Sequence, residues 1–289
     1  MNFKLLAALL IVSLFSACAS KFPNPQLDAA LDTQLSAAQI FNKTFKVHGG
    51  ESLDQLNDVN LSISGQWKRL IKRIQPLVTD FNYRVDSQEH LFPNDGGYGA
   101  LYNGPSGTKK VVRTPDSLEV YYNGEPSSDP EVLSSTALTA DAFHLFLLGP
   151  LALNKWQADF TRLTDITYKD KSYHRLHLYQ KPGFGYSKED QVVLWVDPDT
   201  SLTKMIQITL EGHSTTKSAH VEVEFLDYIQ KGAYIFPSKF FERVNAPISI
   251  DAHAWHLTGL DINRGNSIDD YKGPKDAAIV NYPAAPLKQ

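Results

Sequence analysis

Strand-like alternation dominates the stretch Asp190–Asn263, which begins DQVVLWVDPDT and contains HVEVEFLDYI at His220–Ile229. In the second segment, apolar and acidic side chains alternate, as expected of a sheet with one dry face and one wet face. We therefore expect Val221, Val223 and Phe225 to be buried and Glu222 and Glu224 to be exposed. The whole stretch predicts an antiparallel meander of four or five strands, at Gln191–Val196, Met205–Leu210, His220–Ile229, Ala233–Val244 (interrupted by Pro237) and Ile248–Asn263.

The same alternation recurs upstream of this meander. Further strands are predicted at Val59–Trp67, Asp80–Leu91, Gly97–Asn103, Lys109–Arg113, Ser117–Tyr122, Phe160–Lys169 and Ser172–Gln180. The coarse count is ten or eleven antiparallel strands. The apolar face of such a sheet must either pack against another part of the chain or remain as an open apolar groove.

Two helices interrupt the strands. The first is indicated by apolar residues at spacings of three and four, ending at Gly49-Gly50: Leu27, Leu31, Leu35, Ala38, Phe41 and Phe45. The second, Thr139–Leu148, is capped near Thr139, follows a polar loop at Pro126–Pro130 and is apolar nearly all round. A helix without a polar face must be buried on several sides. The fold class is therefore α+β: a strongly curved antiparallel sheet, or half-barrel, with an N-terminal helix and an inserted apolar helix on its concave side.

The N-terminus predicts export. Leu5–Phe15 is an apolar run of 11 residues, which is too short to span a bilayer. Phe15-Ser16-Ala17-Cys18 resembles a bacterial lipobox, and Cys18 is the sole cysteine. The resemblance implies cleavage before Cys18 and acylation of that residue, and Ala19 favours the outer membrane, with the protein on its periplasmic side. The alternative is an ordinary secretory signal. The expected division is a signal peptide at 1–17, a tether at 18–26, one domain at 27–263 and a tail at 264–289.

The charge limits the partners. The formal net charge is −4, which argues against a nucleic acid and gives no evident basic patch for anionic lipid headgroups. We expect membrane contact through the lipid anchor. Protein partners are not predicted.

Several segments after the lipobox carry a family resemblance. The helix ending in His48-Gly49-Gly50 is followed by a strand that contains Gly65. Leu194–Thr200, Phe225–Tyr228 and the hairpin Gly232–Pro237 come later. In this order they resemble the periplasmic lipoprotein-carrier (LolA/LolB) superfamily over roughly residues 27–263. The resemblance implies an incomplete antiparallel barrel whose apolar cavity takes acyl chains. This chain is longer than the carriers, so the fold is a safer expectation than the sorting function.

Catalytic and metal-binding motifs are absent from the sequence. It contains no Gly-x-Ser-x-Gly, no His-Glu-x-x-His and no phosphate loop. His253 and His256 are three apart in a predicted strand, so they point to opposite faces and cannot share a metal without a bulge. We expect no catalytic residues, no metal and no cofactor.

The aromatic content favours an apolar binding site. The leading hypothesis is a non-enzymatic, lipid-anchored envelope protein that binds an acyl chain or a lipoprotein lipid. Two alternatives remain open: an outer-membrane-tethered interaction module with a closed core, and a hydrolase on the same scaffold. The inserted helix is either a moving lid or a static plug. The candidate ligand-binding residues are Phe143, Phe146, Leu147, Trp195, Phe225 and Trp255.

Overall fold

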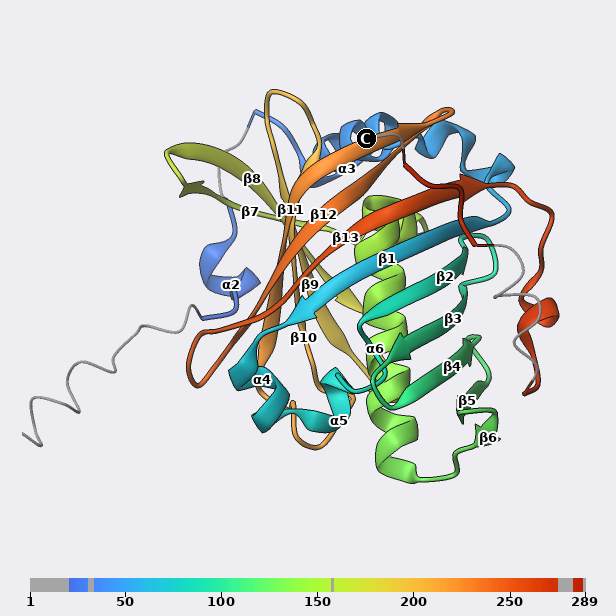
Figure 1. Cartoon of the computed structure of the whole chain (residues 1–289). Coiled ribbons are helices and arrows are strands. Elements are labelled where there is room, and N and C mark those ends of the chain that lie inside the picture. The colour runs from blue at the N-terminus through green and yellow to red at the C-terminus, as the bar shows by residue number, and fades with distance from the viewer. Residues whose placement is uncertain (1–20, 31–33, 157–158, 275–282, 288–289) are drawn as a thin grey trace, which may run out of the picture.

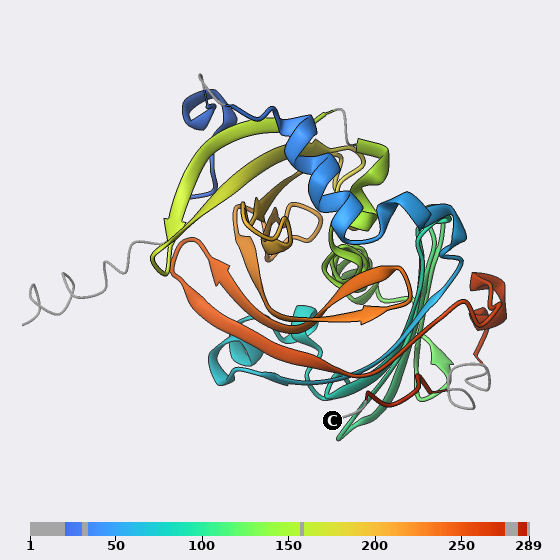
Figure 2. The same ribbon diagram turned by 90° about the horizontal axis from the view of Figure 1, so that it is seen from above.

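The computed structural model describes residues 21–30, 34–156, 159–274 and 283–287. They form one antiparallel sheet of 13 strands in the order β6-β5-β4-β3-β2-β1-β13-β12-β11-β10-β9-β8-β7. The sheet is open, with β6 and β7 at its edges, and it curves strongly (Figures 1 and 2). The strands are β1 (Val59–Trp67), β2 (Asp86–Phe92), β3 (Gly97–Gly104), β4 (Gly107–Arg113), β5 (Leu118–Tyr122), β6 (Glu125–Pro126), β7 (Thr161–Tyr168), β8 (Lys171–Gln180), β9 (Asp190–Val196), β10 (Thr203–Thr209), β11 (His220–Lys231), β12 (Tyr234–Asn245) and β13 (Ile250–Ile262).

The α+β class and the open antiparallel sheet agree with the sequence, but the count of ten or eleven strands is wrong. One strand that the alternation could not reveal is β6, because its two residues are too few to show a period. It pairs with the end of β5 through Tyr121 and Tyr122.

Helix α6 lies inside the curve of the sheet, α3 lies across one end, and η3 packs on the outer face. Figure 2 shows the sheet curving around α6, with α3 over one end. The helical elements are α2 (Pro25–Asp28), α3 (Ala37–Val47), η1 (Gly50–Gln55), α4 (Arg69–Ile74), α5 (Pro76–Thr79), α6 (Pro130–Leu148), η2 (Gly149–Trp156) and η3 (Ile268–Tyr271).

The single N-terminal helix expected from Leu27 to Phe45 is wrong. The chain forms the short α2 and then α3, which begins at a capping box between Ser36 and Gln39. The cap fixes the first turn of α3, because Ser36 Oγ accepts the Gln39 N–H while Gln39 Oε1 accepts the Ser36 N–H. Leu27 consequently lies exposed, whereas Ile40 and Phe41 are buried.

The apolar helix starts earlier than expected. The sequence predicts a cap near Thr139, but α6 begins at Pro130 and Asp129 is its N-cap, with Oδ1 accepting the N–H of Glu131 at 2.9 Å. Pro is favoured at the first helical position, so the proline that suggested a loop instead opens the helix.

The strand expected at Asp80–Leu91 is wrong in its first half, because β2 starts only at Asp86. Residues 80–85 form a turn in which the N–H groups of Tyr83 and Arg84 donate to the Asp80 carbonyl. The turn has an alternating sequence like a strand, but it directs Arg84 into the interior.

The face assignment in β11 is right for the apolar residues, but Glu222 is half-buried and Glu224 is buried, where both were expected to be exposed. Val221, Val223 and Phe225 are buried, whereas Glu224 is only 6% exposed. Its carboxylate accepts from Lys169 at 2.8 Å and pairs with Lys204 at 3.1 Å. The outer face is therefore covered here by the end of the β7–β8 hairpin.

Candidate functional site: the concave face and helix α6

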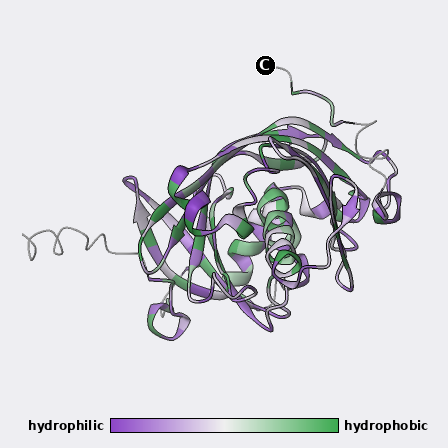
Figure 3. Cartoon of the chain, turned by 60° about the horizontal axis from the view of Figure 1, so that its bottom comes forward, coloured by the Kyte–Doolittle hydropathy of each residue, from purple (hydrophilic) through white to green (hydrophobic). Residues whose placement is uncertain are grey.

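Helix α6 fills the concave face of the sheet. Figure 3 shows it within the curve, coloured largely as hydrophobic. The segment Pro130–Lys155 is long and apolar enough to cross a membrane, but 78% of its most apolar stretch is buried inside the fold. This is the burial expected of a core helix. Its buried residues are Ser135, Thr136, Ala137, Leu138, Ala140, Ala142, Phe143, Leu145, Phe146, Leu147 and Leu148.

An aromatic stack joins α6 to the sheet. The ring of Phe143 stacks on Trp255 of β13 at a centroid distance of 5.3 Å, and Trp255 stacks on Phe240 of β12 at 4.8 Å. Phe225 of β11 meets Phe240 edge-on at 5.5 Å. Five of the six candidate residues share this one apolar cluster: Phe143, Phe146, Leu147, Phe225 and Trp255.

The sixth candidate, Trp195, lies on the other side of the sheet. Its neighbours Leu194 and Val196 point into the main core, so the pleat of β9 turns Trp195 outward. There it packs with Tyr173 and Met205, and its Nε1 donates to Gln207 at 2.8 Å. Trp195 is therefore not part of the concave lining.

Little space remains between α6 and the sheet. A cavity of about 20 Å³ lies beside Phe143, lined also by Gly65, Arg84, Tyr102 and His253. This volume holds about one water molecule. This cavity is too small for an acyl chain.

A buried cation lies against this cavity. The Arg84 guanidinium lies over the rings of Phe143 at 4.7 Å, Tyr102 at 4.9 Å and Trp67 at 5.2 Å. Its Nη1 donates to the Val78 carbonyl at 3.2 Å. Three aromatic faces partly replace the water that burial removes. Sequence reasoning missed Arg84 because a strand at 80–91 would have placed it on the wet face.

Buried acids flank Arg84. Glu89 accepts from Tyr98 at 2.7 Å and from Ser87 at 2.8 Å. Burial raises the pKa of the Glu89 carboxyl, although these hydrogen bonds and the charge of Arg84 oppose the rise. The Ser87 hydroxyl is thus committed to a carboxylate, and no serine activated by a histidine is found among the described residues of this cavity.

A second acid faces a histidine across two strands. Glu242 Oε2 of β12 lies 4.0 Å from His253 Nδ1 of β13, and neither atom has a hydrogen-bond partner among the described residues. Burial raises the pKa of Glu242 to about 7 and lowers the pKa of His253. Burial thus favours the neutral form of both groups.

Gly65 makes room for the side chains of His253 and Trp255. A Cβ at residue 65 would lie 2.7 Å from His253 Nε2 and 2.8 Å from Trp255 Cβ. The His253 ring also stacks on Trp67 at 3.8 Å, while His256 is exposed, so the two histidines face opposite ways as predicted. The described residues contain no group of three or more His, Cys, Asp or Glu side chains placed to hold a metal ion.

His48 and Gly49 connect the end of α3 to the sheet. His48 Nδ1 donates to the Ile235 carbonyl at 2.9 Å, and its Nε2 accepts the Thr203 N–H at 3.2 Å. Gly49 has a φ of +97°, and a Cβ there would lie 2.6 Å from the Ala233 carbonyl oxygen. The motif therefore locks the end of α3 onto the β11–β12 hairpin.

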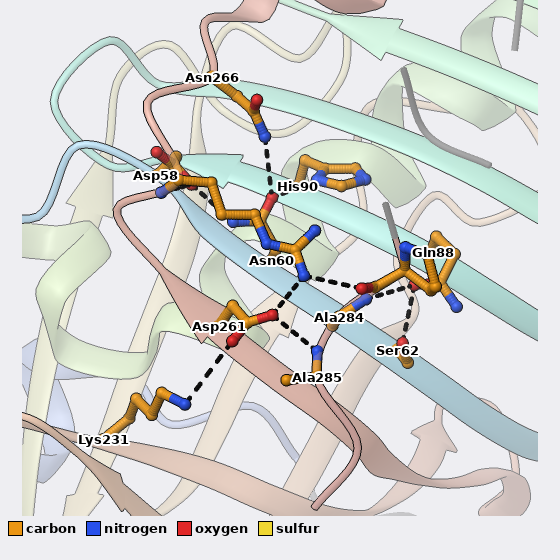
Figure 4. A network of polar contacts seen from close by, with 12 residues as sticks. Asp58, Asn60, Ser62, Gln88, His90, Lys231, Asp261, Asn266, Ala284 and Ala285 are labelled. Atoms are coloured by element: carbon orange, nitrogen blue, oxygen red, sulfur yellow. Dashed lines mark hydrogen bonds and ion pairs between the residues drawn. The ribbon is translucent and has the colours of Figure 1, made fainter. Parts of the chain in front are cut away.

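A polar network fastens the C-terminal residues to the outer face (Figure 4). The Ala285 N–H donates to Asp261 at 2.6 Å, and the Ala284 N–H donates to Gln88 at 3.2 Å. Tyr271, from the region assigned to the tail, is buried and lies 3.0 Å from His90 Nδ1. These contacts attach the end of the chain to the sheet. Cys18 lies outside the described residues.

Comparisons with known proteins identify the fold. No known family profile matches the sequence, and no curated protein matches it. Among solved structures, the chain is similar to the LolA superfamily protein NE2245 from Nitrosomonas europaea, with 12% identity, a TM-score of 0.50 and coverage of 84% of this chain and 99% of that one. A DUF1329 family protein from Desulfovibrio piger has 13% identity and a TM-score of 0.48, over 83% of this chain and 97% of that one. The chain therefore has the LolA-like fold that its sequence segments resemble.

Proposed function

We propose that this is a non-enzymatic, lipid-anchored protein of the bacterial outer membrane, facing the periplasm, that binds an acyl chain or lipoprotein lipid on its concave face. One observation carries the proposal: an open, curved sheet presents an apolar face, and a single helix covers it. The LolA-like fold supports the same reading, because its family resemblance implies an acyl cavity at this place.

In this proposal α6 is a lid. When no lipid is bound, Phe143, Phe146 and Leu147 occupy the acyl site. Exposing each side chain to water costs about 1.5–3 kcal/mol, and bound hydrocarbon offsets that cost by covering the same surface. Phe225 and Trp255 then form the floor of the site.

The first test is binding. Native mass spectrometry of the purified protein should reveal a co-purifying lipid, and a fluorescent fatty acid should bind with an affinity that changes in Phe146→Ala. Tyr186→Ala removes a ring that is 60% exposed and should leave the affinity unchanged. If Phe146→Ala only loses stability, with no binding before or after, the acyl-site proposal is wrong.

A closed-core interaction module is the second candidate. It is favoured by the small cavity beside Phe143, about 20 Å³, because a static plug needs no space. The failure of fatty-acid binding just described would support it. The hydrolase alternative gains no support from the buried groups around Arg84.

The anchor has its own test. Cys18→Ser should abolish labelling with palmitate, because acylation needs the thiol, and it should release the protein from membranes washed at high salt, which screens electrostatic contacts with the lipid headgroups. A variant that fractionates and labels like the parent would show that Cys18 is not the anchor.

A further inference from the structure

Helices α4 and α5 present large apolar side chains to solvent. Leu70 is 49% exposed, Ile74 is 48% exposed and Leu77 is 41% exposed. They lie within eight consecutive positions, in contrast to singly scattered apolar residues, which need no explanation. Figure 1 shows both helices at the lower end of the sheet, near one end of α6.

The local packing explains why these side chains point outward. Ile71 is 3% exposed and packs with Trp67 and Ala252, so it anchors α4 on the sheet. Leu70 and Ile74 are four residues apart and share another side of the helix. Because Ile71 faces the sheet, Leu70 and Ile74 face solvent.

Cations surround the apolar residues. Residues 68–79 read KRLIKRIQPLVT, with Lys68, Arg69, Lys72 and Arg73 and no acidic residue, in a chain of net charge −4. None of the four makes an ion pair with an acidic residue of the described part of the chain. Lys72 instead lies over the ring of Phe81 at 5.1 Å. The expectation from net charge that no basic patch exists is wrong, because a whole-chain sum conceals a local excess.

We propose that this α4–α5 face docks on an anionic phospholipid surface. Exposed apolar side chains interleaved with cations are suited to the boundary between headgroups and acyl chains, where charge and burial act together. A protein partner would have to supply a matching acidic and apolar patch, and nothing in the chain indicates one. The inference does not rest on acyl binding in the concave face.

The α4–α5 face lies close to the cavity beside Arg84 and to helix α6. Val85 is 41% exposed and lines the cavity beside Arg84, in the same turn that follows α5. Helix α5 also contacts α6. Docking would place the membrane surface next to the helix that covers the concave face.

The single native cysteine allows a site-specific test. In the full chain carrying Cys18→Ser, Leu77→Cys provides the labelling site for an environment-sensitive fluorophore. The matched control is Leu226→Cys on β11, where the leucine is 44% exposed. Both proteins have the same N-terminus, so any effect of that segment is common to them.

The expected result is a blue shift at residue 77, and none at residue 226, on adding vesicles of phosphatidylglycerol and phosphatidylethanolamine. Arg69→Gln with Arg73→Gln should weaken the vesicle affinity roughly tenfold or more, and added salt should act in the same direction. Both arginines are exposed, so circular dichroism should confirm an unchanged fold. No shift at residue 77, equal shifts at both sites, or an equal response to phosphatidylcholine vesicles would each overturn the proposal.

Discussion

Phe143 of α6 and Trp255 of β13 stack at a centroid distance of 5.3 Å, joining the central helix to the concave face of the sheet. The Arg84 guanidinium lies over the same Phe143 ring, at 4.7 Å. One phenyl ring therefore contacts both the apolar floor and the buried cation. Its removal tests how firmly α6 is held.

Phe143→Ala should lower the free energy of unfolding by about 3–5 kcal/mol, because it leaves a cavity and takes one aromatic face from Arg84. Urea denaturation measures the change. Leu226→Ala, at an exposed position, should stay within about 0.5 kcal/mol of the parent. Equal losses in both variants would show that Phe143 does not hold α6 in place.

Glu224→Ala should cost about 1–3 kcal/mol, although the alternation of β11 predicts a wet position. The substitution leaves Lys204 and the Tyr168 hydroxyl without their shared carboxylate. Glu125→Ala, at an exposed acid, is the control and should change stability by less than about 0.5 kcal/mol. A Glu224→Ala protein as stable as this control would contradict the buried position of residue 224.

His48 should make the protein sensitive to mild acid. Burial lowers its pKa from 6.5 to about 4, although the hydrogen bond to Ile235 opposes this shift. Between these two pH values the His48 imidazole is protonated in the unfolded chain and neutral in the folded chain, so the free energy of unfolding falls as the pH falls. The full shift is equivalent to about 3 kcal/mol.

The matched variants are His48→Gln and the exposed His256→Gln. Unfolding free energies at pH 7 and pH 4 should show a smaller acid loss in His48→Gln than in the parent, while His256→Gln should follow the parent. Other buried histidines, such as His144, add to the total slope, so only the difference between variants is diagnostic. Identical slopes in all three proteins would refute the assignment to His48.

Glu242 should have the opposite effect on pH dependence. Burial raises its pKa from 4.5 to about 7, against the opposing charge of Arg84. The folded chain keeps a proton that the unfolded chain releases, so this group lowers stability as pH rises through that window, by up to about 3 kcal/mol. Glu242→Gln mimics the protonated form. The gain in unfolding free energy of this variant over the parent should be larger at pH 8 than at pH 4.5. A gain of the same size at both values would show that burial does not raise the pKa of Glu242.

The local periods of side-chain burial can be read from the sequence alone. Alternation in β11 fixed the burial of Val221, Val223 and Phe225, and the lack of a polar face on the helix ending at Leu148 fixed its place inside the fold. Both are properties of short segments, because side-chain direction repeats every two residues in a strand and every 3.6 in a helix. The interval between His253 and His256 placed them on opposite faces for the same reason.

Contacts between distant segments determine which other side chains are buried and what fills the interior. Glu224 is buried because a distant hairpin brings Lys169 over it, and Trp195 faces outward because the pleat of β9 gives its inner side to Leu194 and Val196. Arg84 enters the core because residues 80–85 turn rather than extend. These outcomes depend on contacts between segments far apart in the chain, and the periodicity of a single segment carries no information about its partners.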